Sequence, residues 1–357
     1  MGRGVRQPLR PRPRGLSHAA PHPQGLGPLV QGDHRSPGAR QRAVSCLLAD
    51  VGGTRTRFAL LTDGRLGPIE SLRTGAYASM QDAVHHFLNG QAEGAVVDRA
   101  VIAAAGPVSG HRCKLTNAPW ILDAEGLRQA LHLRSVGLVN DLEALAWAVP
   151  RFGADDVVAI GDGSALQDQP VAVIAPGTGL GISCYLPGTT PRVVASEAGH
   201  ATLAASEAGD AAILEMLRAR FGHVSAERVL SGAGLVNLDA TLATQDGHDP
   251  GSPTPEDIVR GALYGTAPRH AAALDLFCGV LGSFAGDMAL TFAARGGVLI
   301  GGGIAPHIVP LLRSSSFRAR FAAKGRFAGY VEQIPTAVIV RPEPTFLGLA
   351  ALAARGS

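Results

Sequence analysis

The feature that most constrains the fold is a unit in which an apolar strand, a glycine-rich turn and a second apolar strand follow one another. The first unit comprises a strand over 44–50, the turn Gly52-Gly53-Thr54 and a strand over 57–61. The second comprises a strand over 170–175, the turn 176–181 and a strand over 182–185. The two units are 127 residues apart, measured from Asp50 to Gly177. This recurrence predicts two similar α/β halves, each with one glycine-rich turn.

The rest of the chain alternates between helical and strand patterns. We expect helices over 81–88, 124–131, 141–148, 208–221, 226–230, 271–294 and 346–354. We expect further strands over 100–105, 136–139, 192–195, 297–300 and 336–340, and a hairpin turn at Asp63-Gly64. Alternation of this kind predicts α/β layers, and 357 residues are enough for two domains.

Positive charge is concentrated in the first 42 residues, which hold eight Arg and one acid, Asp33. The remaining chain has 24 basic and 28 acidic residues, so it lacks the basic surface of a nucleic-acid-binding core. The first 42 residues also contain seven Pro and no apolar period. They are expected to be a disordered extension without a function of its own.

Cysteine and hydropathy patterns indicate a cytoplasmic protein. The four cysteines, at positions 46, 113, 184 and 278, form no C-x-x-C pair and no zinc-type cluster, which favours a reducing compartment. The longest uncharged stretch, 169–191, is interrupted by Gly and Pro and is no membrane-spanning helix. We expect no membrane partner.

The glycine-rich turns are candidates for gripping phosphate. The only lysines are Lys114 and Lys324, and neither lies in a G-x-x-x-x-G-K-[ST] loop, which excludes a P-loop. Both turns lead into strands and not into helices, which disfavours a Rossmann site. Taken singly, each turn fits an ordinary hairpin. Together with a third run, Gly301-Gly302-Gly303, they indicate a nucleotide in an interdomain cleft, with Asp50 holding a cation through water.

Two further groups of polar residues are candidates for chemistry. Asp141 follows Asn140 where a strand passes into a helix, so it is either a helix N-cap or a general base, with Asn140 orienting the same substrate. Glu197, His200 and Glu227 make a poor zinc set but suit the hydroxyls of a sugar. The alternative is a capped turn followed by a solvated Glu at a helix start.

Six motifs, in this order and spacing, resemble the bacterial glucokinase family. They are Leu47-Leu-Ala-Asp-Val-Gly-Gly-Thr54, Asn140-Asp-Leu-Glu-Ala144, Pro176-Gly-Thr-Gly-Leu-Gly181, Ser196-Glu-Ala-Gly-His200, Val224-Ser-Ala-Glu-Arg-Val-Leu-Ser-Gly232 and Gly301-Gly-Gly-Ile304. The resemblance runs from about Cys46 to the C-terminus. It implies the two-domain actin-like ATPase (ribonuclease H-like) fold, with duplicated α/β domains around an interdomain cleft. Its small domain would comprise 43–151 and 341–357, and its large domain 152–340.

The resemblance also implies the roles of individual residues. Asp141 would be the base that takes the proton from the glucose 6-hydroxyl as it attacks the γ-phosphate of ATP, with Mg²⁺ present. Asn140, Glu197, His200 and Glu227 would bind the sugar. The phosphate loops would be Ala49, Asp50, Val51, Gly52, Gly53 and Thr54 and then Gly177, Thr178 and Gly179, while Gly301, Gly302 and Gly303 would lie against the adenosine.

Two positions depart from the family pattern. Ala198 stands where the family has Gly in Glu-Gly-Gly-His, and Pro176 replaces a small residue before the second turn. Neither change removes a functional group. The resulting hypothesis is a glucokinase of glycolysis, for which the family implies a homodimer. The alternatives are a kinase for another hexose or an amino sugar, and a non-catalytic sugar sensor on the same fold.

Overall fold

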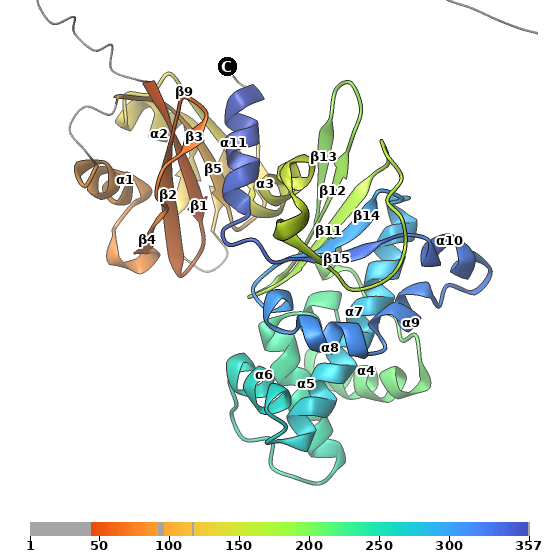
Figure 1. Cartoon of the computed structure of the whole chain (residues 1–357). Helices are drawn as coiled ribbons and strands as arrows, with labels where there is room; N and C mark the ends of the chain where they lie inside the picture. Colours follow the sequence, from red (N-terminus) through yellow and green to blue (C-terminus); the bar gives the residue numbers. More distant parts are fainter. Residues whose placement is uncertain (1–43, 92–95, 116–117, 356–357) are drawn as a thin grey trace, which may run out of the picture. The chain divides into compact units, whose positions relative to one another are not determined.

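The structure, a computed structural model, describes residues 44–91, 96–115 and 118–355 (Figure 1). The expectation that residues 1–42 are disordered concerns a segment outside these described residues. Two mixed β-sheets organise the described chain, and each has helices packed on both of its faces.

The first sheet contains the N-terminal glycine-rich turn. Its strands are β1 (Val44–Val51), β2 (Arg55–Thr62), β3 (Arg65–Leu66), β4 (Glu70–Arg73), β5 (Val96–Ala104) and β9 (Ser135–Asn140). The order is β3-β2-β1-β5-β9, with β4 also paired to β2. Strand β1 runs antiparallel to β2 and parallel to β5, which is parallel to β9. Asp63 and Gly64 both have positive φ in the β2–β3 turn, which confirms the expected hairpin.

The second sheet contains the other glycine-rich turn and repeats this arrangement. Its strands are β10 (Val157–Ala159), β11 (Val171–Pro176), β12 (Leu180–Leu186), β13 (Arg192–Ser196), β14 (Gly297–Ile300) and β15 (Thr336–Ile339). The order is β10-β15-β14-β11-β12-β13. Strand β11 runs antiparallel to β12 and parallel to β14, which is parallel to β15. The two hairpins expected from the sequence are confirmed, and both lie inside their sheets. A small third sheet contains β6 (Val108–Ser109), β7 (Arg112–Lys114) and β8 (Ile121–Asp123).

Helices α1 (Met80–Asn89) and α2 (Ala124–Ala130) cover one face of the first sheet. Phe58 on β2 stacks on Phe87 of α1, with ring centroids 5.3 Å apart. Residues Leu48 and Ala59 point to the opposite face, because side chains alternate along a strand. They pack against Phe346 of α11 (Thr345–Arg355), and this same cluster includes Ala144 of α3 (Asp141–Trp147).

Helices α3 and α11 also contact the second sheet. Trp147 of α3 packs edge-on against Tyr185 of β12, with centroids 6.0 Å apart, and the Ser183 hydroxyl donates to the Leu142 carbonyl at 2.9 Å. The two helices approach so closely that a β-carbon on Gly348 would overlap the carbonyl oxygen of Ala144. Packing against both sheets therefore fixes the position of α3, which begins at Asp141.

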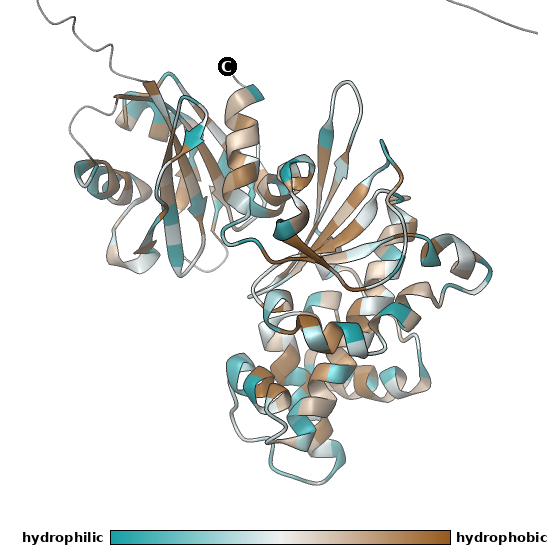
Figure 2. Ribbon diagram, in the orientation of Figure 1, coloured by the Kyte–Doolittle hydropathy of each residue, from teal (hydrophilic) through white to brown (hydrophobic). Residues whose placement is uncertain are grey.

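The opposite face of the second sheet supports the largest apolar cluster. Its helices are α4 (Ala208–Phe221), α5 (Gly232–Gln245), α6 (Pro255–Leu263), α7 (Pro268–Thr291), α8 (Val309–Ser314), α9 (Phe317–Ala322) and α10 (Ala328–Glu332). Short 3₁₀ turns lie at Thr74–Ala76, Val149–Arg151, Ala154–Asp156, Ala198–His200, Ala226–Arg228, Ala305–His307 and Gly325–Phe327. Figure 2 shows hydrophobic residues along the strands of this sheet.

Helix α7 is the one described helix that is long and apolar enough to cross a membrane. However, 78% of its apolar window is buried inside the protein, where it packs against α5, α6 and α9. A core helix passes the same test of length and composition, so α7 is weak evidence for a membrane span.

The helix expected over 226–230 is wrong. This segment forms a 3₁₀ turn at Ala226–Arg228, and the α-helix begins only at Gly232. Ser231 caps that helix by accepting the Gly234 N–H at 3.0 Å, and Gly234 has no space for a β-carbon beside the Val229 backbone. Gly232 and Gly234 lower the helical propensity of the first turn, so the sequence did not predict α5. Helix α6 was not predicted either, although Thr254 and Asp257 form a capping box at its start and Pro255 is its first residue.

Candidate active site

The carboxyl edge of the first sheet brings Asp50 and Asp141 into one region. Strands β1, β5 and β9 are parallel, and their register aligns Val51 with Ala104 and Ala104 with Asn140. Asp50 therefore precedes the last residue of β1, and Asp141 follows the last residue of β9, at the same edge. Ligands of α/β sheets bind outside the carboxyl ends of strands, so this edge is the expected place for a substrate.

Asn140, and not Asp141, is the N-cap of α3. The Asn140 side-chain oxygen accepts the N–H groups of Leu142 at 2.9 Å and Glu143 at 3.3 Å, and its amide nitrogen donates to the Gly106 carbonyl at 3.1 Å. The alternative in which Asp141 merely caps the helix is therefore wrong. Capping leaves one N–H of the Asn140 amide for a ligand, and it leaves the Asp141 carboxylate at the first helical position.

The surroundings of Asp141 suit a general base. The pKa of Asp141 is raised to about 6, first by burial and next by the nearby carboxylate of Asp50, with a smaller effect from Glu197. The Leu142 N–H, which donates to Asp141 Oδ1 at 2.9 Å, opposes these effects. A carboxylate with a pKa near the working pH is ionised at neutrality, yet it is basic enough to accept a proton.

Asp50 is held by an ion-pair chain. Arg57 on β2 donates from Nη1 to Asp50 Oδ2 at 3.2 Å, and its Nε lies 3.0 Å from Glu343 Oε1. The Asp50 side chain is only 15% exposed, and burial raises its pKa to about 6 against the opposing effect of Arg57. Within the part of the chain that the structure describes, no cluster of three His, Cys, Asp or Glu residues could hold a metal by itself.

The first glycine-rich turn is held in place by a residue that the sequence did not indicate. Thr74 follows β4, and its hydroxyl donates to the Gly52 carbonyl at 2.8 Å while its N–H donates to the Thr54 carbonyl at 3.0 Å. Gly52 itself leaves little space, because a β-carbon would lie 3.0 Å from the Arg55 carbonyl oxygen. Thr74 is 22 residues from Gly52, so no local signal could have identified it.

The second glycine-rich turn lies beside the third glycine run. Within the turn, the Gly177 N–H donates to the Gly179 carbonyl at 2.8 Å. A β-carbon on Gly177 would lie 3.7 Å from the Gly303 nitrogen. Gly302 has a φ of 79°, and a β-carbon there would overlap the carbonyl oxygen of Pro176. The two runs expected to contact the nucleotide are thus neighbours, and position 302 requires glycine.

The structure brings together the three residues expected to bind the sugar. His200 Nε2 lies 3.7 Å from Glu197 Oε2, and His200 Nδ1 lies 3.9 Å from Glu227 Oε1. The side chains of Glu197 and His200 are 66% and 61% exposed, so they are accessible to a ligand. The segments that carry these residues are joined by a hydrogen bond from the Ala226 N–H to the Ala201 carbonyl at 3.0 Å.

Glu227 differs from the expectation in two respects. It lies in a 3₁₀ turn and does not begin an α-helix. It also accepts the Leu180 N–H on Oε2 at 2.9 Å, and a β-carbon on Gly179 would lie 2.5 Å from that oxygen. Glu227 therefore connects the carboxylate–imidazole group to the second glycine-rich turn, a contact between residues 47 positions apart in sequence.

Comparisons with known proteins show the family of this chain. The family model described as Glucokinase matches residues 47–356. The chain is 41% identical over 309 residues to the glucokinase of Paramagnetospirillum magneticum, which covers 86% of this chain and 96% of that protein. This chain belongs to the glucokinase family. The resemblance inferred from six sequence motifs is confirmed.

Solved structures of glucokinases share this fold. The crystal structure of a glucokinase from an Antarctic psychrotroph has a TM-score of 0.79 at 34% identity and covers 87% of this chain and 99% of its own. A ROK family glucokinase from Streptomyces griseus, solved in complex with glucose and AMPPNP, has a TM-score of 0.60 at 22% identity and covers 88% of this chain and 100% of its own. The latter likeness is one of fold alone.

The structure explains why one departure from the glucokinase family pattern is tolerated. Gly199, the second glycine of the family motif, is buried, and a β-carbon there would overlap the carbonyl oxygen of Leu180. Ala198 instead packs at the edge of the large apolar cluster, where its methyl group is accommodated. Pro176 ends β11, and its carbonyl still accepts the Ile304 N–H at 3.4 Å.

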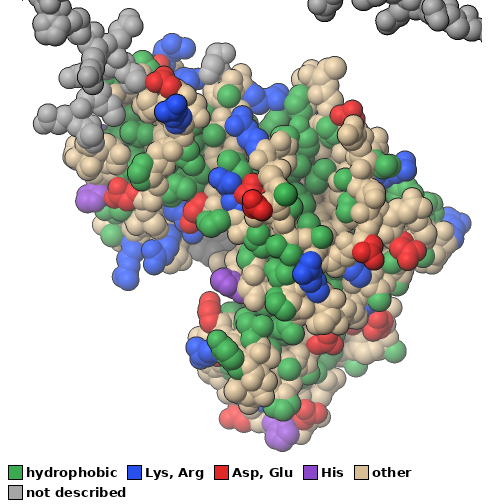
Figure 3. Space-filling model, viewed as in Figure 1, with side chains coloured by type: hydrophobic (Ala, Val, Ile, Leu, Met, Phe, Trp, Pro, Cys, Tyr) green, Lys and Arg blue, Asp and Glu red, His purple; other side chains and the backbone are tan. Residues whose placement is uncertain are grey.

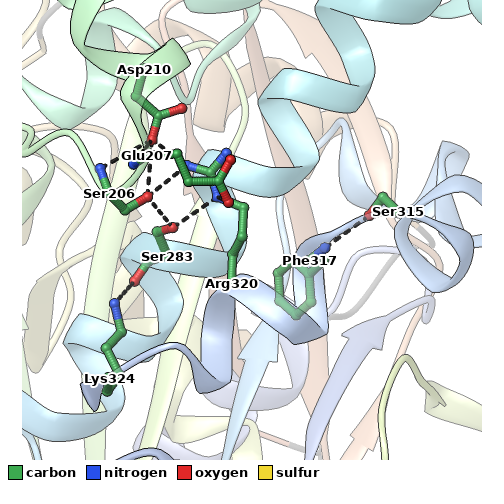
Figure 4. A network of polar contacts seen from close by, with 8 residues as sticks. All are labelled: Ser206, Glu207, Asp210, Ser283, Ser315, Phe317, Arg320 and Lys324. Atoms are coloured by element: carbon green, nitrogen blue, oxygen red, sulfur yellow. Dashed lines mark hydrogen bonds and ion pairs between the residues drawn. The ribbon is translucent and has the colours of Figure 1, made fainter.

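A buried ion pair anchors the chain that follows His200 in this glucokinase family member (Figure 4). The guanidinium of Arg320 pairs with the Asp210 carboxylate and donates to the hydroxyls of Ser206 at 2.7 Å and Ser283 at 3.1 Å. Asp210 also accepts the Ser206 N–H at 3.1 Å. The network joins α4, α7 and α9 to Ser206, six residues after His200.

Proposed function

We propose that Asp141 is the general base with which this glucokinase-family chain transfers the γ-phosphate of ATP to the 6-hydroxyl of glucose. The observation that carries the proposal is its position. This half-buried carboxylate stands at the carboxyl edge of the first sheet. Its pKa is raised to about 6, in part by the negative charges of Asp50 and Glu197 on two other segments. A general base must lie between the phosphate donor and the sugar. Asp50 belongs to the proposed nucleotide side of the site, and Glu197 belongs to the proposed sugar side.

In the proposed reaction, Asp141 accepts the proton of the 6-hydroxyl while the sugar oxygen attacks the γ-phosphorus. The new O–P bond forms as the bond between the γ-phosphorus and the bridging oxygen breaks, and ADP leaves with the electron pair. The protein itself contributes mainly position and charge, because phosphoryl transfer asks for little covalent chemistry from side chains.

The ring hydroxyls of glucose would be held by Asn140, Glu197, His200 and Glu227. The proximity of His200 to both glutamates supports this role, since neighbouring carboxylate and imidazole groups accept and donate hydrogen bonds to adjacent hydroxyls. The remaining N–H of the Asn140 amide is available beside Asp141. Fixing the ring in this way would place the 6-hydroxyl in line with the γ-phosphate.

The phosphates of ATP would contact 49–54 and 177–179, and the adenosine would lie against 301–303. The contact of Gly177 with Gly303 supports one continuous nucleotide surface. Asp50 fits a hydrated Mg²⁺, because this ion keeps several waters and needs only one or two carboxylates besides substrate phosphates. When bound, the ion would supply positive charge against the phosphates.

We further propose that the fold is the two-domain actin-like ATPase type, with a small domain of 43–151 and 341–357 and a large domain of 152–340. The shared order of the two sheets around β1 and β11 supports this division. Glucose would close the two domains and exclude water from the phosphate. Small-angle scattering should show compaction with saturating glucose. The homodimer implied by the family and the cytoplasmic location indicated by the cysteine pattern belong to the same proposal.

The direct test is ADP release from ATP and magnesium with a panel of hexoses, using the native chain and Asp141→Ala. Glucose-dependent turnover that falls by about 10²–10⁴-fold in the variant would support the reaction and the base. Turnover with mannose or an N-acetylated amino sugar in place of glucose would change the substrate. No turnover with any hexose, in a folded protein that binds ATP, would favour the sugar sensor.

A further inference from the structure

We propose that Arg55 and Arg73 form an anion subsite that holds the phosphate chain of the nucleotide beside the first glycine-rich turn. The proposal rests on the proposed function, in that it assigns a nucleotide to this turn. Nothing in the sequence motifs or in the ion pairs of the described chain gives these two arginines another role.

The strand register places the two arginines directly opposite each other. Arg55 begins β2 immediately after Thr54 of the turn, and Arg73 ends β4 immediately before Thr74. Arg55 and Arg73 are paired in the β2–β4 ladder, where opposed β-carbons lie about 4.5–5.5 Å apart. Since Thr74 hydrogen bonds to the turn, both side chains start at its border.

Both arginines lie on the face of the sheet that carries Asp50. Arg57 stands opposite Asp50 in the β1–β2 ladder and is bonded to its carboxylate. Arg55 is two residues before Arg57 on the same strand, and residues two apart point to the same face. Arg73, opposite Arg55, shares that face. The pair is therefore on the same side as the proposed cation position, at the end of the strands nearest the turn.

The charges of this pair are uncompensated within the described residues. Arg57 is neutralised by Asp50 and Glu343, but no described carboxylate forms an ion pair with Arg55 or Arg73. Arg55 donates instead to the neutral Ser71 hydroxyl at 3.5 Å, and both arginines are exposed. Figure 3 shows Lys and Arg side chains gathered near this end of the first sheet. Directly opposed like charges destabilise a β-ladder, so the pair costs stability unless an anion sits between the guanidinium groups.

The chain also has few lysines for the phosphates. Of its two lysines, Lys324 is bonded to Asp287 at 2.6 Å and to the Ser283 carbonyl at 2.8 Å, and Lys114 lies on β7 of the third sheet. A guanidinium binds two phosphate oxygens at once, and two opposed guanidinium groups can clamp a polyphosphate. In the absence of a P-loop lysine, Arg55 and Arg73 supply this charge.

The experiment measures binding of ADP and of adenosine by calorimetry, without added magnesium, to the full chain and its Arg55→Ala and Arg73→Ala variants. The matched control is Arg65→Ala, which removes the same charge from exposed β3 of the same sheet. We expect the preference for ADP over adenosine to fall at least about 10-fold in each variant, since hydrogen bonds to charged groups are worth that factor or more. Adenosine affinity and the control should change less than about 2-fold, because surface substitutions away from a site have small effects.

Three results would overturn the proposal. In the first, both variants retain the preference for ADP over adenosine. In the second, the affinity for adenosine falls together with the affinity for ADP. In the third, the preference for glucose 6-phosphate over glucose falls and the preference for ADP does not. The last outcome would assign the pair to the sugar product. Because these are binding ratios, they test the pair even if the wild type transfers no phosphate to glucose, so failure of the proposed reaction is seen separately.

Discussion

Glu227 offers the sharpest test of how the site is assembled, because it contacts both candidate substrate regions. Its Oε2 accepts the Leu180 N–H at 2.9 Å, and its Oε1 faces His200 Nδ1 at 3.9 Å. Glu197 lies on the other side of His200, is 66% exposed, and has no hydrogen bond to the glycine-rich turn among the described contacts. The two glutamates are therefore matched in chemistry but differ in their connection to the nucleotide region.

Glu227→Ala should raise the KM values for glucose and for ATP together. The lost bond between a carboxylate and a backbone N–H is worth about 1.5–3 kcal/mol, so we expect KM for ATP to rise about 10-fold or more. Glu227→Gln keeps a carbonyl oxygen that can accept the Leu180 N–H, and neutral hydrogen bonds are about 1 kcal/mol weaker, so KM for ATP should rise by about 5-fold or less. Glucose binding should remain weakened in both variants.

Initial-rate kinetics with both substrates varied would measure these effects, and Glu197→Ala is the control. We expect this control to raise KM for glucose and to leave KM for ATP unchanged. The reasoning would be refuted if Glu227→Ala left KM for ATP at the native value, or if Glu197→Ala raised it equally. Thermal unfolding of each variant would show that the differences arise in folded protein.

Three further predictions follow from buried charges. Because the pKa of Asp141 is raised to about 6, the base is lost as pH falls through that value, and log kcat/KM should decline below about pH 6. A flat profile from pH 5 to 8 would contradict the assignment. The same raised pKa means that ionised Asp141 destabilises the fold. Asp141→Asn should therefore be inactive, yet its free energy of unfolding at pH 8 should be about 1–3 kcal/mol higher in denaturant unfolding. This difference should shrink toward pH 5. Arg320→Ala leaves Asp210 buried without its partner and should cost about 3–5 kcal/mol in the same assay, whereas a loss below about 1 kcal/mol would show that the network does not stabilise the fold.

Local patterns predicted much of the fold and the position of the candidate site. The two hairpins with their glycine-rich turns were predictable, since glycine and alternating apolar residues act through neighbours in the chain. The strand-to-helix junction at Asp141 was visible for the same reason. The start of α5 was not predictable, because Gly232 and Gly234 are poor helix formers. The first turn of this helix depends on the Ser231 cap and on the close contact of Gly234 with Val229.

The tertiary structure decided how these parts act on one another. The bonds from Thr74 to Gly52, from Leu180 to Glu227 and from Arg57 to Glu343 join residues far apart in sequence, and no local preference specifies such pairs. The raised pKa of Asp141 likewise depends on burial and on charges carried by other segments. The sequence alone determined which chemical groups the chain has and the strands and turns that carry them, because those depend on short-range sterics. Distances and electrostatics came from the packing of α3 and α11 between two sheets, which only the folded chain creates.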